Sequence, residues 1–113
     1  MKRKHLRFGK GFDVVIGNDR SQAAQMVIPA GECEGGADNR HGGADQWLFV
    51  VDGTGSAIVN GKRYALRTGS LLLIERGDTH EIRNGGRGEL KTLNIYVPPA
   101  YTPSGRERPA AKP

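Results

Sequence analysis

Glycines and other turn-forming residues divide this 113-residue chain into short runs, and this division restricts its fold more than any other feature. Seventeen glycines and six prolines are spread along the chain without a period. The runs between them have strand length rather than helix length. Asn60-Gly61 separates the runs 55–59 and 62–66, and it is a strong hairpin signal because both turn positions require positive φ. We therefore expect an all-β fold.

Alternation at a period of two is clearest from Asp45 to Val51, where Gln46, Leu48 and Val50 share one face. Asp45 is expected on the opposite face unless a bulge intervenes. Residues 31–44 contain five glycines and predict a long loop or a ragged strand edge, a kind of segment that often carries function. Further strands are predicted at 12–16, 21–28, 70–76, 80–83 and 90–97. About eight short strands without helical periodicity indicate a sandwich or barrel.

The charge distribution suggests a single domain with two basic ends. Residues 1–10 hold five basic residues and no acidic one, and they are predicted to be an N-terminal arm. Residues 11–100 form the predicted domain, which is mildly acidic, with nine basic against eleven acidic residues. Residues 101–113 lack periodicity and predict a disordered tail. A nucleic-acid binder should carry a basic face on the fold itself, so no nucleic-acid partner is expected.

Cellular context follows from apolar runs and cysteine usage. No apolar run approaches the roughly twenty residues of a membrane span, so no membrane partner is expected. The single cysteine, Cys33, cannot form an internal disulfide, which favours a cytoplasmic location.

Apolar side chains occur on both faces of two predicted strands. Leu71 to Ile74 are all apolar, and Trp47 and Phe49 lie opposite the Gln46 face. Because one face of an antiparallel sheet usually meets water, this second face needs a cover. The N-terminal strands or a second subunit could supply it, and we expect a homodimer.

Two histidines carry the chemistry that the sequence suggests. His41 and His80 each lie where a predicted strand meets a glycine-bearing loop. Strands distant in sequence can bring such residues together inside a barrel, and imidazole is the commonest protein ligand of transition metals near neutral pH.

The surroundings of His80 resemble the second motif of the cupin family, G-x5-P-x-G-x2-H-x3-N. Gly69, Gly77, His80 and Asn84 occupy its positions in register, with Glu75 in place of the proline. The resemblance extends from about Gly31 to Pro98. It implies a double-stranded β-helix, or jelly-roll, barrel that often holds a divalent metal.

The first cupin motif, G-x5-H-x-H-x3,4-E-x6-G, is matched less completely. With Gly53 as its last glycine, Gln46 takes the glutamate position, His41 the second histidine and Asn39 the first. The resemblance therefore implies His41, Gln46 and His80 as metal ligands, with Asn39 nearby to bind a cofactor or a water. Replacing the carboxylate by an amide leaves a neutral ligand set and weakens metal affinity. A metal-free polar pocket remains the alternative.

The last predicted strand has one polar and one apolar face. Thr92, Asn94 and Tyr96 alternate with Leu93, Ile95 and Val97. If the polar set points inward, Asn94 and Tyr96 line a binding pocket with Gln46 and His80. If the apolar set does, it forms ordinary core, and the sequence leaves both possibilities open.

Two functional classes agree with these residues. The first is a metal-dependent cupin enzyme, a dioxygenase or an isomerase, in which Fe, Ni, Mn or Zn binds a small oxygen-rich ligand such as an enol or catechol. The second is a noncatalytic small-molecule-binding cupin with a degenerate, metal-free site. The absence of an evident proton-transfer pair favours the second class, and fold alone does not decide between them.

Overall fold

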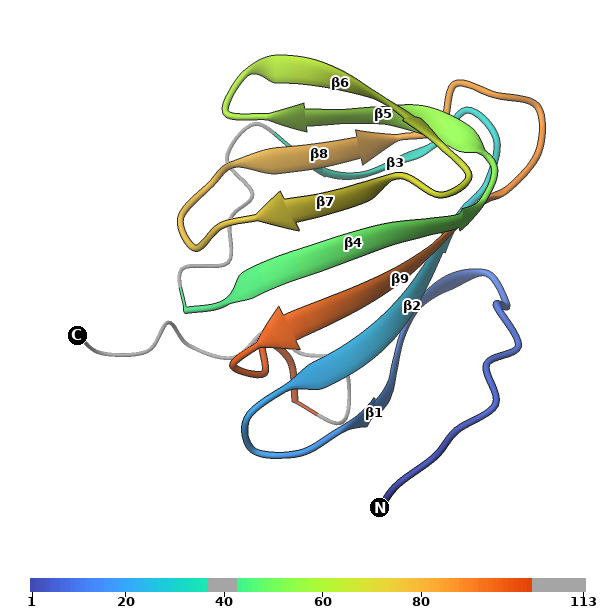
Figure 1. Ribbon diagram of the computed structural model, residues 1–113. Coiled ribbons are helices and arrows are strands. Elements are labelled where there is room, and N and C mark those ends of the chain that lie inside the picture. The colour runs from blue at the N-terminus through green and yellow to red at the C-terminus, as the bar shows by residue number, and fades with distance from the viewer. Residues whose placement is uncertain (37–42, 103–113) are drawn as a thin grey trace.

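The computed structural model describes residues 1–36 and 43–102, and it consists of two antiparallel sheets (Figure 1). The five-stranded sheet has the order β1-β2-β9-β4-β7, and the four-stranded sheet has the order β3-β8-β5-β6. The strands are β1 (Gly11–Gly17), β2 (Gln22–Ile28), β3 (Cys33–Gly36), β4 (Asp45–Asp52), β5 (Thr54–Val59), β6 (Lys62–Arg67), β7 (Leu71–Ile74), β8 (His80–Arg83) and β9 (Leu90–Val97). The predicted all-β jelly roll is confirmed.

The hairpin between β5 and β6 has the geometry that its sequence predicts. Val59 pairs with Lys62, and the two turn residues Asn60 and Gly61 have φ values of 50° and 80°. Asparagine and glycine tolerate this left-handed region better than other residues do.

The hydrophobic core lies between the two sheets. Met26, Leu48 and Leu90 from the larger sheet pack in one cluster with Ala57 and Ile82 from the smaller one. These five side chains are at most 6% exposed. Their burial is the main driving force that holds the sheets face to face.

The burial pattern of strand β9 shows which of its two faces points into the core. Thr92, Asn94 and Tyr96 are buried, whereas Leu93 and Ile95 are only partly buried. Asn94 lies opposite Leu48 of β4, whose side chain is fully buried in the core. The polar set therefore points inward.

The outer face of the larger sheet is apolar and partly covered. Trp47 and Phe49 of β4 are 41% and 40% exposed, and they pair with Leu73 and Leu71 of β7. The N-terminal segment runs alongside β1 and β2 (Figure 1), where Phe8 N donates to Gln25 Oε1 at 3.2 Å. The segment thus accompanies one side of this sheet and leaves the β4–β7 side open.

Strand β3 lies at the edge of the smaller sheet, within residues 31–44, for which the sequence predicts a long loop or a ragged strand edge. Cys33 to Gly36 pair with the whole of β8, Gly36 opposite His80. No described residue belongs to a helix of the length and apolarity needed to cross a membrane.

Candidate functional site

A pocket of about 250 Å³ lies between the sheets and brings Gln46 and His80 together. Gln46 comes from β4 of the larger sheet and His80 from β8 of the smaller one, so they approach from opposite sheets. Both side chains are buried, at 2% and 5% exposure. The remaining lining residues are Phe12, Met26, Glu34, Gly35, Ile82, Tyr96 and Tyr101.

Gln46 is held by a chain of buried hydrogen bonds. Its Nε2 donates to Asn94 Oδ1 at 2.8 Å, and Asn94 Nδ2 donates to Thr92 Oγ1 at 3.0 Å. Thr92 Oγ1 donates in turn to the Met26 carbonyl oxygen at 2.9 Å. Asn94 and Thr92 are both fully buried, so water does not substitute for these partners.

The Met26 carbonyl fixes the direction of the whole chain because a carbonyl can only accept. The Thr92 hydroxyl must give its proton to this carbonyl, so its oxygen accepts from the Asn94 amide group. Asn94 then presents its oxygen to Gln46, which must donate with Nε2. Gln46 Oε1 is left over, buried and without a hydrogen-bond partner among residues 1–36 and 43–102. Gln46 therefore meets the pocket as an acceptor.

His80 is positioned by a braced turn that precedes β8. Asp78 Oδ2 accepts from Glu75 N at 2.9 Å, and Asp78 Oδ1 accepts from Asn60 Nδ2 at 2.9 Å. Asn60 Oδ1 accepts from Thr79 N at 3.0 Å. The hairpin turn at Asn60 thus holds the residue before His80 and fixes where β8 begins.

Asp45, the acidic residue next to Gln46, has a structural contact. Asp45 Oδ1 accepts from Arg76 N at 2.8 Å, so Asp45 holds the β7–β8 turn. Asp45 does not line the pocket that Gln46 shares with His80, as expected from strand alternation. Glu75 belongs to the same turn and is exposed.

His41 and Asn39 lie outside the described residues, so their predicted roles stay predictions. Among residues 1–36 and 43–102, no three histidine, cysteine, aspartate or glutamate side chains cluster closely enough to hold a metal ion. Of the predicted cofactor-binding residues, Tyr96 lines the pocket, whereas the Asn94 side chain is engaged by Gln46 and Thr92.

Tyr101 is a pocket residue that the sequence analysis assigned to the tail. Its ring lies 4.6 Å from the Phe12 ring and 5.1 Å, edge-on, from the Tyr96 ring. Gln22 clamps its backbone, since Nε2 donates to Tyr101 O at 2.7 Å and Oε1 accepts from Tyr101 N at 3.0 Å. The preceding Pro98-Pro99 turn was a signal that the chain changes direction, but nothing local indicated a partner 79 residues away.

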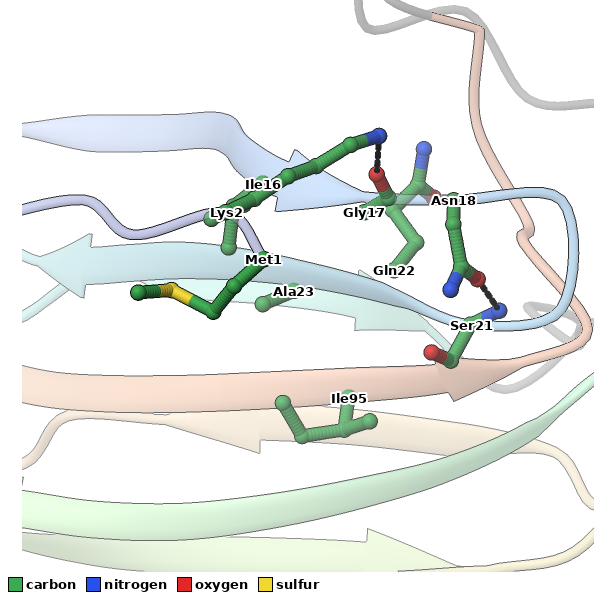
Figure 2. Close-up of a pocket in the computed structure, with 9 residues that line it drawn as sticks. All are labelled: Met1, Lys2, Ile16, Gly17, Asn18, Ser21, Gln22, Ala23 and Ile95. Carbon is green, nitrogen blue, oxygen red and sulfur yellow. Dashed lines mark hydrogen bonds between the residues drawn. The ribbon is translucent and has the colours of Figure 1, made fainter.

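A second hollow of about 400 Å³ lies between the N-terminal residues and the larger sheet (Figure 2). Met1 and Lys2 close it from one side and Ile95 from the other, and Lys2 Nζ donates to the Gly17 carbonyl at 2.7 Å. It is larger than the pocket at Gln46, but Lys2 is its only titratable side chain. It therefore has fewer side chains that could bind a metal ion or exchange a proton with a ligand.

Comparison with known proteins identifies the family. A family model for the cupin domain matches residues 24–96, a range that contains Gln46 and His80. The chain belongs to the cupin family. This agrees with the register of Gly69, Gly77, His80 and Asn84 in the sequence.

Two curated relatives are similar over most of this chain. A mannose-1-phosphate guanylyltransferase from Klebsiella pneumoniae is 30% identical over 83 residues, 74% of this chain and 17% of the relative. An oxalate-binding protein from Thermotoga maritima is 27% identical over 74 residues, 66% of this chain and 60% of the relative. This cupin chain thus spans less than two thirds of either relative.

Solved structures share the fold. A cupin family protein with a double-stranded β-helix fold from Methanocaldococcus jannaschii superposes with a TM-score of 0.69 and 15% identity. The match covers 86% of this chain and 87% of that one. At this identity the similarity shows a shared fold, and it extends over most of both chains.

Proposed function

We propose that this cupin binds a small oxygen-rich molecule in the pocket between its sheets, with a divalent ion as the bridge. The observation that carries the proposal is the fixed amide of Gln46, whose oxygen is a buried acceptor in the pocket that His80 also lines. A buried acceptor without a donor costs about 1–3 kcal/mol. A cation or a ligand hydroxyl would remove that cost.

The donor set fits a weakly held divalent ion. His80 would supply an imidazole and Gln46 an amide oxygen, and His41, from outside the described residues, would supply a second imidazole. Such a neutral set suits Fe, Ni, Mn or Zn, although it lacks the carboxylate that raises affinity for a hard cation. When bound, the ion would act as a Lewis acid toward two neighbouring ligand oxygens.

The pocket volume supports a small ligand. At about 250 Å³ it falls below the roughly 300–1,000 Å³ typical of sites for drug-sized molecules. The similarity to an oxalate-binding protein supports an oxygen-rich ligand of this size. Binding, rather than turnover, is the function that this site favours.

Catalysis as a metal-dependent dioxygenase or isomerase is the second candidate. It is favoured by the presence of the Glu34 carboxylate and the His80 imidazole on the lining of one pocket. Two such groups can exchange protons with a bound substrate. Oxygen consumption or isomerised product with the metal-loaded protein would establish it.

We also propose a homodimer through the exposed apolar face of β4 and β7. Trp47, Phe49, Leu71 and Leu73 are 40–61% exposed and adjacent in the sheet register. A contiguous apolar patch of this kind marks an interaction surface. A second copy is the proposed occupant because a twofold dimer would bury this same apolar patch on both subunits.

A cytoplasmic location is part of the same proposal. It is supported by Cys33, which is exposed and carries a free thiol. Exposed free thiols persist best in a reducing compartment.

Metal content tests the proposed binding function. Protein purified without chelator and then incubated with ferrous, nickel, manganese or zinc ions should retain about one ion per chain. The double variant His41→Ala, His80→Ala should retain none. His5→Ala is the matched control, because His5 is exposed in the N-terminal segment. Absence of metal from the parent after incubation with all four ions would favour a metal-free binding module.

A further inference from the structure

We infer that Glu34 of β3 is a further ligand of the divalent ion and supplies the carboxylate that the inner face of β4 lacks. The inference rests on the proposed function, because it adds one donor to the same site. The cupin spacing puts Gln46 at the glutamate position of the first motif, so the motif residues leave the site without a negative charge. Glu34 falls at a position for which that motif specifies no residue, and only the structure brings it to the site.

The register of β3 places the Glu34 side chain on the inner face of the smaller sheet. Strand β3 runs beside β8 (Figure 1), with Glu34 opposite Ile82 and Gly36 opposite His80. Side chains of directly opposed residues project to the same face of a sheet. Ile82 is 1% exposed in the core between the sheets, so this face is the inner one. Glu34 and His80 are then diagonal neighbours, and long side chains can span the roughly 7–8 Å between such positions.

Gly36 leaves open space beside the His80 imidazole. It is the residue of β3 directly opposite His80, and a Cβ added to it would meet nothing within 4 Å. Glu34, Gln46 and His80 all line the same pocket of about 250 Å³. Strand β3 thus brings a carboxylate to this pocket without a side chain that would fill the space next to the imidazole.

The charges and hydrogen-bonding groups of the pocket call for a cation. Among the described lining residues, Glu34 is the only acidic one, and none is lysine or arginine. Gln46 meets the pocket with Oε1, a buried acceptor. An ionised carboxylate and an amide oxygen are both acceptors and cannot bond to each other. A divalent ion between them satisfies both, because carboxylate and amide oxygens are ligands for hard cations.

A donor set with a carboxylate changes which ion the site prefers. Carboxylate oxygens suit Mn²⁺, whereas imidazole nitrogens suit Ni²⁺ and Zn²⁺. Among residues 1–36 and 43–102, the set holds one histidine, one glutamate and an amide, which agrees with the absence there of three clustered histidine, cysteine, aspartate or glutamate side chains. As a ligand, Glu34 is not free to exchange protons with a substrate, and this distinguishes the assignment from the second candidate function.

Calorimetric titration of the full-length protein with Mn²⁺ and with Ni²⁺ tests the assignment. Glu34→Gln keeps the size and removes the charge. Mn²⁺ should then bind at least about tenfold more weakly, because even groups that only support a metal ligand contribute roughly 10–100-fold. The loss for Ni²⁺ should be smaller, since imidazole contributes more of its affinity. Glu34→Asp keeps a carboxylate and should bind Mn²⁺ more tightly than Glu34→Gln does.

Glu81→Gln is the matched control, and thermal melting checks that the variants fold. Glu81 follows His80 on β8, so its side chain points to the opposite face, where it pairs with Arg83 at 3.1 Å. Removing this charge should change Mn²⁺ affinity by less than about twofold, because solvent and salt screen it from the pocket. Glu34 is exposed on an edge strand, so its variants should melt at the parental temperature.

The outcomes separate this inference from the proposed function. If Glu34→Gln binds Mn²⁺ with parental affinity, or loses no more than Glu81→Gln does, Glu34 is not a ligand, whereas ion binding between the sheets stands. If the parent protein binds none of the four divalent ions, the proposed function is wrong and this inference falls with it.

Discussion

Replacing Thr92 by valine tests the buried hydrogen-bond chain that orients Gln46. Valine matches threonine in shape but lacks the hydroxyl, so the Met26 carbonyl loses a donor and the Asn94 amide loses its acceptor. Thr92 and Asn94 are fully buried, so water cannot replace the missing oxygen. A buried donor left unpaired costs about 1–3 kcal/mol.

The expected loss for Thr92→Val is therefore about 2 kcal/mol in the free energy of unfolding. For a domain of this size, that corresponds to a fall in Tm of roughly 10 °C. Thr92→Ser is the matched control, because it keeps the hydroxyl and removes one buried methyl group, at a cost of about 1 kcal/mol. The prediction is thus that serine is better tolerated than valine, although valine fills the space better.

Urea unfolding followed by far-UV circular dichroism, together with calorimetric melting, measures both variants. The metal affinity of Thr92→Val should also fall, because its Asn94 and Gln46 amides are free to turn over and present nitrogen to the pocket. A valine variant at least as stable as the serine variant would refute the directional chain from Met26 to Gln46.

Three further perturbations follow from the fold and the site. Gly55→Ala should lower the free energy of unfolding in urea by several kcal/mol, because the new Cβ would lie 2.4 Å from the Arg83 carbonyl oxygen. Gly85→Ala is the control and should be nearly neutral, because a Cβ there meets nothing within 4 Å. Leu73→Lys should convert the proposed dimer to a monomer in light scattering, and an unchanged mass would contradict the interface. In thermal melts, a divalent ion at a hundred times its Kd should stabilise the parent protein by about 2.7 kcal/mol. The same stabilisation of the His80→Ala variant would show that the ion does not bind at His80.

Strand β4 illustrates what the sequence could predict. The period-two alternation placed Gln46 and Trp47 on opposite faces of the strand, and their exposures are 2% and 41%. The prediction succeeds because a one-residue shift would exchange every inner and outer side chain of the strand. The same reasoning, with the cupin spacing around His80, brought Gln46 and His80 to one pocket.

The inner face of β9 could not be predicted in this way. Its inward side chains Thr92 and Asn94 are polar, contrary to the usual placement of apolar residues in the core. They are tolerated because they bond to Gln46 and to the Met26 carbonyl, which are distant in sequence. Their pairing becomes visible only when β2, β4 and β9 are adjacent.

The pocket position of Tyr101 was missed for a similar reason. Tyr101 contacts Gln22, which lies 79 residues earlier, and the Phe12 ring, whose centroid lies 4.6 Å from its own. Composition after Pro98-Pro99 predicted a tail, because a local pattern contains no information about such a distant clamp. His41 and Asn39 remain predictions from the cupin spacing.

Paramagnetic broadening by Mn²⁺ in two-dimensional ¹H–¹⁵N NMR tests most directly whether the pocket shared by Gln46 and His80 binds the ion. At substoichiometric Mn²⁺, the backbone signals of Gly35, His80 and Ile82 and the side-chain amide of Gln46 should broaden first. The signals of Gly53 and Gly69, at the end of β4 opposite to Gln46, should broaden last. Broadening confined to exposed acidic turns, with the Gln46 amide unaffected, would contradict a metal site between the sheets.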